Sequence, residues 1–490
     1  MKILPDNVRS QAFIDGKFVD AEGGAEFEDL NPATGKLLVE VAACSASDVD
    51  AAVKAARAAF NAGAWSRIEP RERKRVLLKF AELVEANGQE IALLDSIDAG
   101  KPIVDCENLD VPDVVSNIRW YAEAIDKVFG KISPTGEGNL GLIVREPVGV
   151  VGMVLPWNFP AGTLSWKIAP ALAAGNSIVV KPAELAPLST LRIAELAFDA
   201  GIPAGVFNVV PGLGHVAGKA LGLHPDVDVI SFTGSTEIGR QFLRYSADSN
   251  LKKVVLECGG KSPQIVMADA AQNLDRIAEN LANAAFWNMG QNCTCGSRIL
   301  VQSSIKQDFV DSLVKASKNW VVGEPTDHTT KLGPLIEASA LTRVLGAIEQ
   351  ARKDGATIAS GGKQLFQETG GWFVEPTVVD NVHPDTALAR DEIFGPVVAV
   401  LPFDTEEDAI RIANASAYGL AATVFSTDIN VAIRVARAVQ AGTVAVNGYG
   451  EGDITTPFGG YKTSGFGGYD KGLEAFDQYT QLKTIWLTLG

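Results

Sequence analysis

The chain has 490 residues, 47% of them hydrophobic and 21% charged, which is a globular composition long enough for two or three domains. Its 59 acidic and 43 basic residues give a formal net charge of −16, and no basic stripe interrupts the excess, which argues against nucleic acid as a partner. No apolar run approaches the roughly 20 residues of a membrane-spanning helix, and Pro5, Asp6 and Asn7 interrupt any apolar secretion signal. We therefore expect a soluble, cytoplasmic protein with no membrane partner.

Two segments of the first 150 residues have clear patterns. Residues 70–94 place apolar side chains on one face and charges on the other, which predicts one amphipathic helix. Residues 131–149 have the composition of a hairpin that projects between helices.

From residue 149 onward, β-rich runs bordered by glycine or proline alternate with helical stretches. Strands are predicted at 149–157, 177–182, 206–210 and 227–234, and a helix at 188–200 ends at Gly201. The second half continues with runs at 371–382, 392–403, 422–427 and 442–447. Strand–helix–strand alternation predicts a doubly wound, mostly parallel sheet, and two such α/β domains account for the chain.

A glycine-rich turn follows the run at 227–234. Gly234 ends the strand, and Ser235 and Thr236 are candidates for the N-cap of the next helix, whose free amide groups favour a phosphate. Upstream, Gly212-x-Gly214-x-x-Ala217 is a partial dinucleotide fingerprint. Together the two motifs favour a pyrophosphate-containing ligand.

The stretch NMGQNCTCGSRIL contains Cys293 and Cys295, two of five cysteines. An odd number in a long chain does not indicate a disulfide framework. The four histidines stand singly without zinc-type spacing, so we expect no metal. Two interpretations remain for the pair: a thiolate nucleophile or small buried side chains.

Polar residues also follow other predicted strands. Glu257 ends the run before Gly259, and Asn158 lies in the proline-bordered turn PWNFP. Each has an ordinary interpretation as a loop acid or a turn residue. Their conjunction with a thiol and phosphate-type loops favours a site at the carboxyl ends of the strands.

Seven motifs carry a resemblance to a known family: PWNFP, KPAE, FTGSTEIG, LECGGKSP, GQNCTCGSR, EIFGPV and PFGGYKTSG. In order and spacing they resemble the NAD(P)-dependent aldehyde dehydrogenase superfamily, from about residue 13 to the C-terminus. The resemblance implies an α/β fold with a Rossmann-like NAD-binding domain (1–128 and 148–259), a catalytic domain (260–462) and a small β oligomerisation element (129–147 and 463–490). It implies a homodimer or homotetramer, with the C-terminal strand 482–490 in the interface, although that strand could instead dock onto its own domain.

The resemblance also implies catalytic roles. Cys293 would be the nucleophile that forms a thiohemiacetal and then a thioester, and Asn158 would hold the oxyanion. Glu257 would be the base for the hydrolytic water. Lys167 and Asp470 would relay protons, although glutamate is usual at the second position. Cys295 would be a packing residue.

Further residues are carried over for the cofactor and the aldehyde. NAD is implied, and preferred to NADP because the carboxylate of Glu184 would repel a 2′-phosphate. The NAD-binding candidates are Trp157, Lys181, Glu184, Gly214, Phe232, Gly234, Ser235, Glu392 and Phe394. The substrate-binding candidates are Phe159, Thr163, Trp166, Trp287, Asn292, Thr294, Glu451, Asp453 and Phe458.

The GDIT-PFGG run resembles the branch that oxidises γ-glutamyl-γ-aminobutyraldehyde and related ω-amino or guanidino aldehydes of polyamine catabolism. An aromatic tunnel with Glu451 and Asp453 at its mouth would suit a cationic aldehyde. The alternatives are an aromatic or medium-chain aldehyde of the phenyl- or indole-acetaldehyde type, a CoA-acylating enzyme, and a non-catalytic NAD-binding relative. The presence of Cys293, Glu257 and Asn158 argues against the last two.

Overall fold

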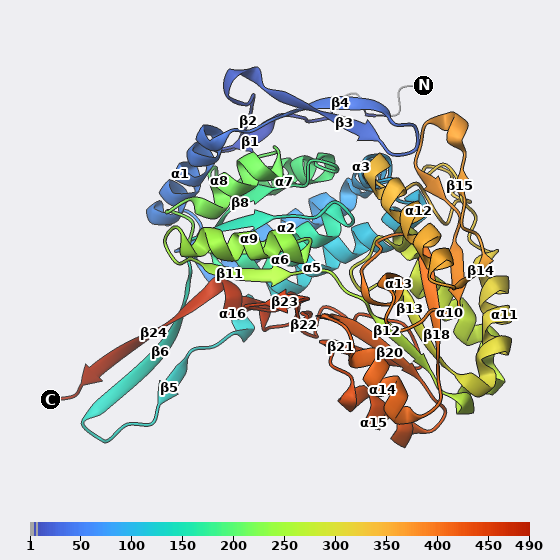
Figure 1. Ribbon diagram of the computed structural model, residues 1–490. Coiled ribbons are helices and arrows are strands. Elements are labelled where there is room, and N and C mark those ends of the chain that lie inside the picture. The colour runs from blue at the N-terminus through green and yellow to red at the C-terminus, as the bar shows by residue number, and fades with distance from the viewer. Residues whose placement is uncertain (1–3, 6–7) are drawn as a thin grey trace.

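Two mostly parallel sheets organise the computed structural model, which describes residues 4–5 and 8–490, so Asp6 and Asn7 lie outside it (Figure 1). The first sheet has eight strands in the order β2-β1-β9-β8-β7-β10-β11-β23, and its centre, from β9 to β11, is parallel. Its strands are β1 (Ala12–Ile14), β2 (Lys17–Val19), β7 (Val150–Val154), β8 (Ser177–Lys181), β9 (Phe207–Val209), β10 (Val229–Thr233), β11 (Lys253–Glu257) and β23 (Gly465–Phe466). The strands predicted at 149–157, 177–182, 206–210 and 227–234 are confirmed as β7 to β10.

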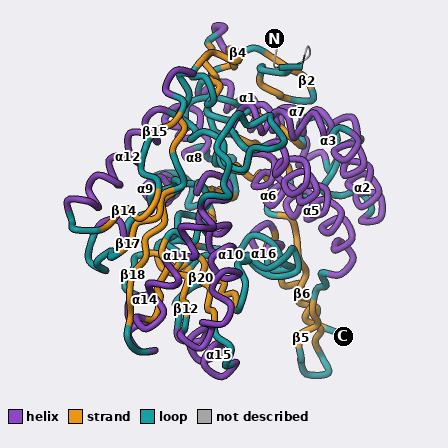
Figure 2. Tube along the Cα trace, turned by 90° about the vertical axis from the view of Figure 1, so that its right-hand side faces the viewer, coloured by secondary structure: helices purple, strands orange, loops and turns teal. Residues whose placement is uncertain are grey.

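Helices cover both faces of this sheet, as doubly wound topology requires. On β8, Ile178 and Val180 pack into the core formed with α2, α5, α6 and α7, whereas Val179 packs into the opposite core with α1, α8 and α9. Figure 2 shows α2, α5 and α6 side by side. The helices are α1 (Ala46–Ala62), α2 (Pro70–Ala86), α3 (Gly88–Ala99), α4 (Ile103–Asp105), α5 (Val111–Ala124), α6 (Pro160–Ala174), α7 (Leu188–Ala200), α8 (Lys219–Leu223), α9 (Thr236–Ala247) and α16 (Ala475–Tyr479).

The single helix predicted over 70–94 is wrong, because the chain breaks between α2 and α3. Asn87 leaves helical geometry, and both its backbone N–H and its side-chain amide donate to the carbonyl of Leu83. An asparagine side chain that bonds the backbone locally competes with helix continuation, and Gly88 follows it. The helix predicted to end at Gly201 is confirmed as α7, with Gly201 in the left-handed conformation.

The second sheet has seven strands in the order β14-β17-β18-β13-β12-β20-β21 and is parallel from β17 to β21. Its strands are β12 (Pro263–Val266), β13 (Arg298–Gln302), β14 (Thr357–Ser360), β17 (Thr377–Asp380), β18 (Val397–Phe403), β20 (Ala421–Phe425) and β21 (Thr443–Val446). Its helices are α10 (Leu274–Phe286), α11 (Lys306–Ser317), α12 (Ala338–Lys353), α13 (Ala387–Arg390), α14 (Glu406–Asn414) and α15 (Ile429–Ala438). Three two-stranded pairs are β3 (Glu26–Asn31) with β4 (Lys36–Ala42), β15 (Gln364–Leu365) with β16 (Phe373–Val374), and β19 (Tyr418–Gly419) with β22 (Tyr461–Lys462).

Two strands predicted in this half are shorter than expected. The run 371–382 is two strands in different sheets, β16 and β17, separated at Pro376. The run 392–403 becomes a strand only at Val397, because Phe394 has a positive φ of 56° and Pro396 has no N–H to donate to a ladder. The runs at 422–427 and 442–447 are confirmed as β20 and β21.

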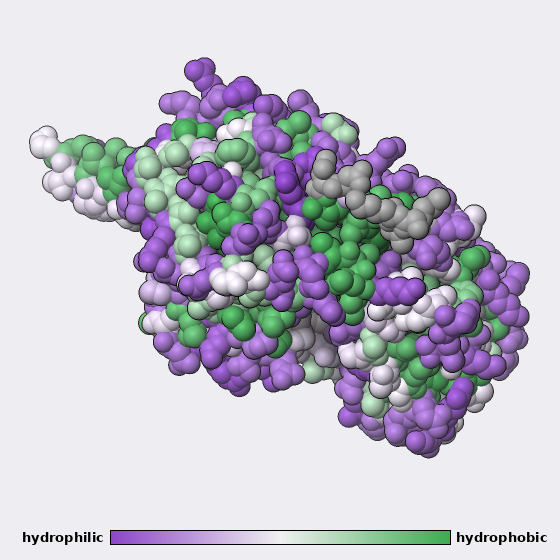
Figure 3. All heavy atoms as spheres, turned by 90° about the horizontal axis from the view of Figure 1, so that it is seen from above, coloured by the Kyte–Doolittle hydropathy of each residue, from purple (hydrophilic) through white to green (hydrophobic). Residues whose placement is uncertain are grey.

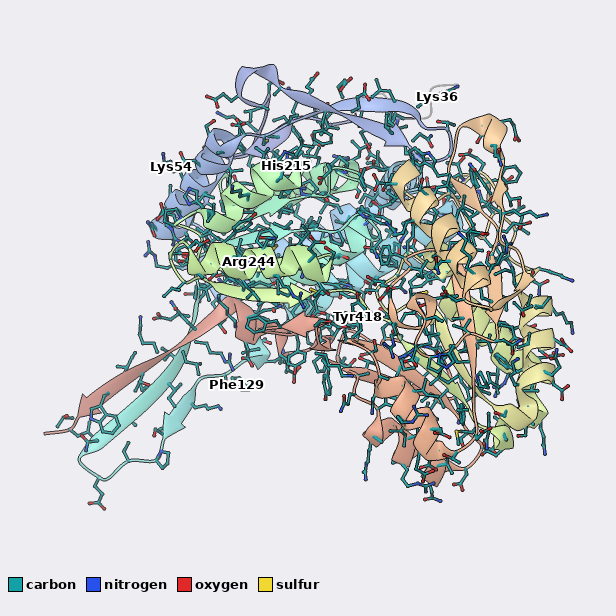
Figure 4. All side chains as sticks on the ribbon, viewed as in Figure 1. Lys36, Lys54, Phe129, His215, Arg244 and Tyr418 are labelled. Atoms are coloured by element: carbon teal, nitrogen blue, oxygen red, sulfur yellow. The ribbon has the colours of Figure 1, made fainter. Side chains whose placement is uncertain are left out.

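A three-stranded arm projects from the body, at the lower left of Figure 1. The hairpin predicted at 131–149 is confirmed as β5 (Lys131–Ser133) and β6 (Asn139–Pro147), and the C-terminal strand β24 (Thr480–Thr488) pairs with β6 antiparallel along its length. β24 therefore docks onto its own chain by one edge, and its other edge has no partner strand among the described residues. The arm shows apolar patches at the left of Figure 3, and Figure 4 labels Phe129, 76% exposed, at its base.

No helix within residues 4–5 and 8–490 is both long enough and apolar enough to cross a membrane.

Candidate active site

A cavity of about 1460 Å³ opens at the carboxyl ends of the parallel strands of the first sheet. Its wall includes residues that directly follow β7, β8, β10 and β11, the position at which open α/β sheets bind ligands. Residues of the second half, including Cys293 and Glu392, complete the wall. His215, labelled in Figure 4, is another of the lining residues.

One end of the cavity presents the start of α9. Ser235 is the N-cap, as predicted, and its hydroxyl accepts a hydrogen bond from the N–H of Ile238 at 3.3 Å. A Cβ added to Gly234 would lie 2.6 Å from the ring of Phe232, so this position requires glycine. Free amide groups and the positive end of the helix dipole make this end suitable for a phosphate group.

A carboxylate also lines the cavity wall. Glu184 accepts hydrogen bonds from Lys181 Nζ at 2.8 Å and from the backbone N–H of Gly214 at 3.3 Å. Burial lowers the pKa of Lys181, which Glu184 partly offsets. The lysine at the end of β8 and the glycine turn after β9 thus fix a carboxylate in the cavity wall.

The cavity wall also contains an aromatic pair and another carboxyl group. The rings of Trp157 and Phe394 meet edge to face with centroids 5.3 Å apart. Glu392 accepts a hydrogen bond from the N–H of Gly260 at 3.0 Å, and burial raises its pKa to about 7. A Cβ on Gly259 would lie 2.2 Å from Glu392 Oε2, so this glycine permits the approach.

Cys293 lies in the cavity wall and is half-buried. It follows η6 (Trp287–Gly290), and a Cβ on Gly260 would lie 2.3 Å from its carbonyl oxygen, so backbone packs directly against backbone there. Burial raises the pKa of the thiol well above its usual value, and the carboxylates of Glu451, Glu392 and Glu257 raise it further. Forming the thiolate therefore depends on the charge state of these neighbours.

Cys295 differs from its neighbour. Its side chain does not line the cavity, and its Sγ donates to the carbonyl of Ala285 at 3.4 Å. Burial raises its pKa to about 12. All five cysteines are free thiols, and Cys293 is the one that is not fully buried.

Glu257, at the end of β11, also lines the cavity. It is only 3% exposed, and neither carboxyl oxygen has a hydrogen-bond partner in the described part of the chain. Burial raises its pKa well above the usual value, the charge of Asp470 adds to the rise, and Lys167 opposes it. A buried, unpaired carboxyl group that faces a cavity is free to exchange a proton with a ligand or water there.

Lys167 and Asp470 form a buried ion pair beside it, with 2.9 Å between Lys167 Nζ and Asp470 Oδ2. Lys167 also donates to Ser231 at 3.1 Å, and Gln478 donates to Asp470 Oδ1 at 3.2 Å. Asp470 lines the cavity, whereas Lys167 lies behind it.

Asn158 is held by its backbone as well as its amide. Its carbonyl accepts hydrogen bonds from Asn288 at 3.0 Å and from Lys101 Nζ at 3.2 Å, and its side-chain amide donates to the carbonyl of Gln291 at 2.9 Å. An amide nitrogen carries two hydrogens, so one remains for the cavity that Asn158 lines.

Aromatic side chains line the remaining part of the cavity. Phe159 and Trp287 lie with ring centroids 5.2 Å apart, as do Trp166 and Phe458. Thr163 lines the wall beside them. These five residues, all predicted to bind the substrate, therefore line the same cavity.

The two predicted carboxylates at the mouth have different positions. Glu451 lines the cavity and accepts a hydrogen bond from the hydroxyl of Thr294. Because that bond uses the only hydroxyl proton of Thr294, Tyr449 must donate in the 2.8 Å hydrogen bond between the two hydroxyls. Thr294 supports Glu451 without lining the cavity itself.

Asp453 does not face the cavity, contrary to expectation. Its exposed carboxylate accepts hydrogen bonds from the N–H and hydroxyl of Thr455, closing a tight turn, which is the ordinary role of an aspartate in a loop. Apart from Lys167, Thr294 and Asp453, every predicted site residue lines the cavity.

Several lining residues were missed from the sequence. Asp113 lies in the first turn of α5, where an acidic residue usually only complements the helix dipole. Lys471 directly follows Asp470 in the chain, and no sequence motif marks it as a site residue. Asp110 also lines the cavity, paired with Lys101 at 2.9 Å. Only contacts across the fold distinguish these residues. No group of three or more His, Cys, Asp or Glu within the described residues has the geometry of a metal site.

The model of the aldehyde dehydrogenase family matches residues 18–485. The chain belongs to the aldehyde dehydrogenase family. It is 52% identical to the aminoacetaldehyde dehydrogenase of Pseudomonas aeruginosa over 97% of this chain and 95% of that protein.

Solved structures of family members share the fold. The γ-glutamyl-γ-aminobutyraldehyde dehydrogenase of Burkholderia cenocepacia is 50% identical with a TM-score of 0.96, covering 99% of this chain and 97% of that one. The indole-3-acetaldehyde dehydrogenase of P. syringae, solved in complex with NAD+, is 49% identical with a TM-score of 0.97 over the same shares of the two chains. The predicted family and fold class are thus confirmed.

Removing the negative charge of Glu451 should lower the pKa of Cys293. We expect Glu451→Gln to lower it, because a nearby like charge disfavours the thiolate. The measurement is the pH dependence of iodoacetamide alkylation of Cys293, followed by peptide mass spectrometry. Asp453→Asn is the matched control, because this carboxylate lies outside the cavity wall. An equal shift in both variants, or none in Glu451→Gln, would contradict the local effect.

Proposed function

We propose that the protein oxidises an aldehyde to its carboxylic acid with NAD as the oxidant. The observation that carries this proposal is the cavity shared by the thiol of Cys293, the unpaired carboxyl group of Glu257 and the amide of Asn158. A nucleophile, a base and an oxyanion donor are the groups that acyl chemistry at a carbonyl requires.

The first half of the reaction forms a carbon–sulfur bond. The thiolate of Cys293 attacks the aldehyde carbon, and the resulting oxyanion accepts hydrogen bonds from the amide of Asn158 and the backbone N–H of Cys293. Loss of one such donor typically costs about 10²–10³ in rate. Departure of the hydride from this thiohemiacetal leaves a thioester on Cys293.

The second half consumes water. Glu257 takes a proton from a water molecule that attacks the thioester carbon, the acid leaves, and the Cys293 thiolate is restored. Burial raises the pKa of Glu257, which makes its carboxylate a stronger base than an exposed glutamate. The Lys167–Asp470 pair beside Glu257 would carry the proton onward. This base also argues for water, rather than CoA, as the acceptor of the acyl group.

The residues present fit NAD. The start of α9 with Gly234 and Ser235 would hold the pyrophosphate, with Phe232 and Gly214 alongside, and Lys181 and Glu184 would hold the adenine ribose. Glu392 would bind the nicotinamide ribose, and Phe394 would pack beside the nicotinamide with Trp157 next to it. When bound, NAD supplies the hydride acceptor.

We propose an ω-amino, γ-glutamylamino or guanidino aldehyde of polyamine catabolism as the substrate. Carboxylates of Asp113 and Glu451 lie in a cavity lined by aromatic rings, which suits a methylene chain that ends in a cation. The aminoacetaldehyde and γ-glutamyl-γ-aminobutyraldehyde enzymes among the relatives support this class. The indole-3-acetaldehyde enzyme supports the alternative of an aromatic aldehyde more weakly, because a neutral indole needs neither carboxylate.

The assembly belongs to the same proposal. The division into an NAD-binding domain (1–128 and 148–259), a catalytic domain (260–462) and an oligomerisation element (129–147 and 463–490) follows the two sheets and the arm, with β23 of the last segment joining the first sheet. An unpaired β24 edge with exposed Leu482 and Trp486 suits pairing with a second copy. On this basis we propose a homodimer or homotetramer.

The nucleophile is tested by a pair of thiol variants. Cys293→Ala should abolish NADH formation from an aldehyde and NAD while leaving NAD binding near the wild-type value, because the thiol forms the covalent bond and the cofactor contacts remain. Cys295→Ala should retain substantial activity, because its thiol lies outside the cavity. Steady-state rates and NAD titration measure both. Activity in Cys293→Ala with none in Cys295→Ala would assign the chemistry to the other thiol.

Cofactor preference is tested at Glu184. We expect Glu184→Gln to lower the ratio of kcat/KM for NAD to that for NADP by about tenfold or more, because like-charge contact with the 2′-phosphate is removed. The amide keeps an acceptor oxygen for the ribose hydroxyls and the N–H of Gly214. Glu237→Gln, which also lines the cavity but on the first turn of α9, is the comparison variant. A ratio unchanged in Glu184→Gln would remove the basis for NAD preference.

A further inference from the structure

Lys471 is a buried cation in the wall of the cavity. It is 5% exposed, and its ammonium group lies 3.9 Å from the ring centroid of Trp166 and 5.6 Å from that of Phe458. Across the described ranges, 4–5 and 8–490, no carboxylate lies within ion-pair distance of Lys471 Nζ. Its neighbours are the two aromatic rings and, at longer range, the charge of Asp453, so this cavity-lining ammonium keeps hydrogen-bond donors free for an anionic ligand.

The same indole also positions a negative charge. Trp166 donates its Nε1–H to Asp113 Oδ2 at 2.8 Å, and Asp113 lines the cavity as Lys471 does. The face of the ring therefore contacts a cation, and its N–H edge contacts a carboxylate. By contrast, Asp110 is already neutralised by its ion pair with Lys101.

A substrate whose only charge is positive does not match both of these charged groups. A substrate that carried only an ammonium group would be attracted by Asp113 and repelled by Lys471. A substrate that ends in both an ammonium and a carboxylate, as the α-amino acid end of a γ-glutamyl group does, would pair its ammonium with Asp113 and its carboxylate with Lys471.

We propose that Lys471 and Asp113 form a dipolar subsite around the Trp166 indole, with Lys471 over the ring face and Asp113 at the N–H edge. In this subsite Lys471 binds a carboxylate and Asp113 binds an ammonium group, both at the end of the substrate remote from the aldehyde. This inference rests on the proposed function and selects, within its amino aldehydes, those with an amino acid head. Lys471 acts on specificity and takes no part in bond making or breaking.

Four aldehydes of matched length test the subsite. The first is γ-glutamyl-γ-aminobutyraldehyde, and the others lack its carboxylate (the 4-aminobutanoyl amide), its ammonium (the glutaryl amide), or both (the butanoyl amide). With the wild-type protein, removal of either charge should lower kcat/KM roughly tenfold or more, as expected for a charge-assisted hydrogen bond.

Three variants distinguish a role in substrate binding from a role in supporting Trp166. Lys471→Met should remove the advantage of the two carboxylate-bearing aldehydes and raise kcat/KM for the aldehyde with ammonium alone, because a repelling charge is lost. Lys471→Arg should keep the wild-type order. Asp113→Asn, which keeps an acceptor for Trp166, should remove only the advantage of the ammonium.

The outcomes distinguish this inference from the proposed function. If Lys471→Met changes kcat/KM for all four aldehydes by the same factor, the lysine only supports Trp166 and the dipolar subsite is wrong, while aldehyde oxidation stands. If the wild-type protein forms no NADH with any of the four or with a simple alkanal, the proposed function itself fails.

Discussion

Glu257 is buried with no hydrogen-bond partner among residues 4–5 and 8–490, and this is the constraint on which the rest of the site depends. A carboxyl group in that position is costly unless it is protonated or stabilised by charge, and burial, Asp470 and Lys167 together determine its pKa. Its position at the end of β11, opposite Cys293, follows from the parallel sheet. The fold therefore maintains a proton acceptor where a covalent intermediate on Cys293 would need one.

Close backbone contacts join the two halves of the site. Gly260 packs against the carbonyl of Cys293, Gly259 admits Glu392, and Gly459 lies close enough that an added Cβ would come 3.2 Å from Glu257 Oε1. These glycines follow strands or turns of both halves and leave no room for side chains. The relative positions of the thiol, the base and the cofactor contacts thus depend on backbone packing, which rearranges less readily than side chains.

Much of the fold and most of the cavity could be predicted from the sequence, and the failures have physical causes. Periodicity located β7 to β10, but it did not reveal the helix break at Asn87, where a local side-chain hydrogen bond competes with the helix. The apolar composition around Phe394 predicts a strand, because nothing in that composition indicates the positive φ of Phe394. Asp453 was assigned to the mouth by proximity in sequence to Glu451, although a tight turn directs it elsewhere. Lys471 and Asp113 were missed because only contacts across the fold bring them to one indole.

The central claim is that Cys293 carries an acyl group which Glu257 helps water to remove. The most direct measurement is the mass of the Cys293 peptide in Glu257→Gln, quenched after mixing with NAD and an aldehyde, alongside NADH formation on the same time scale. The account predicts a burst of about one NADH per subunit, a peptide heavier by the acyl group, and turnover slowed by roughly 10²–10⁴. Steady turnover at the wild-type rate with no acylated peptide would contradict it.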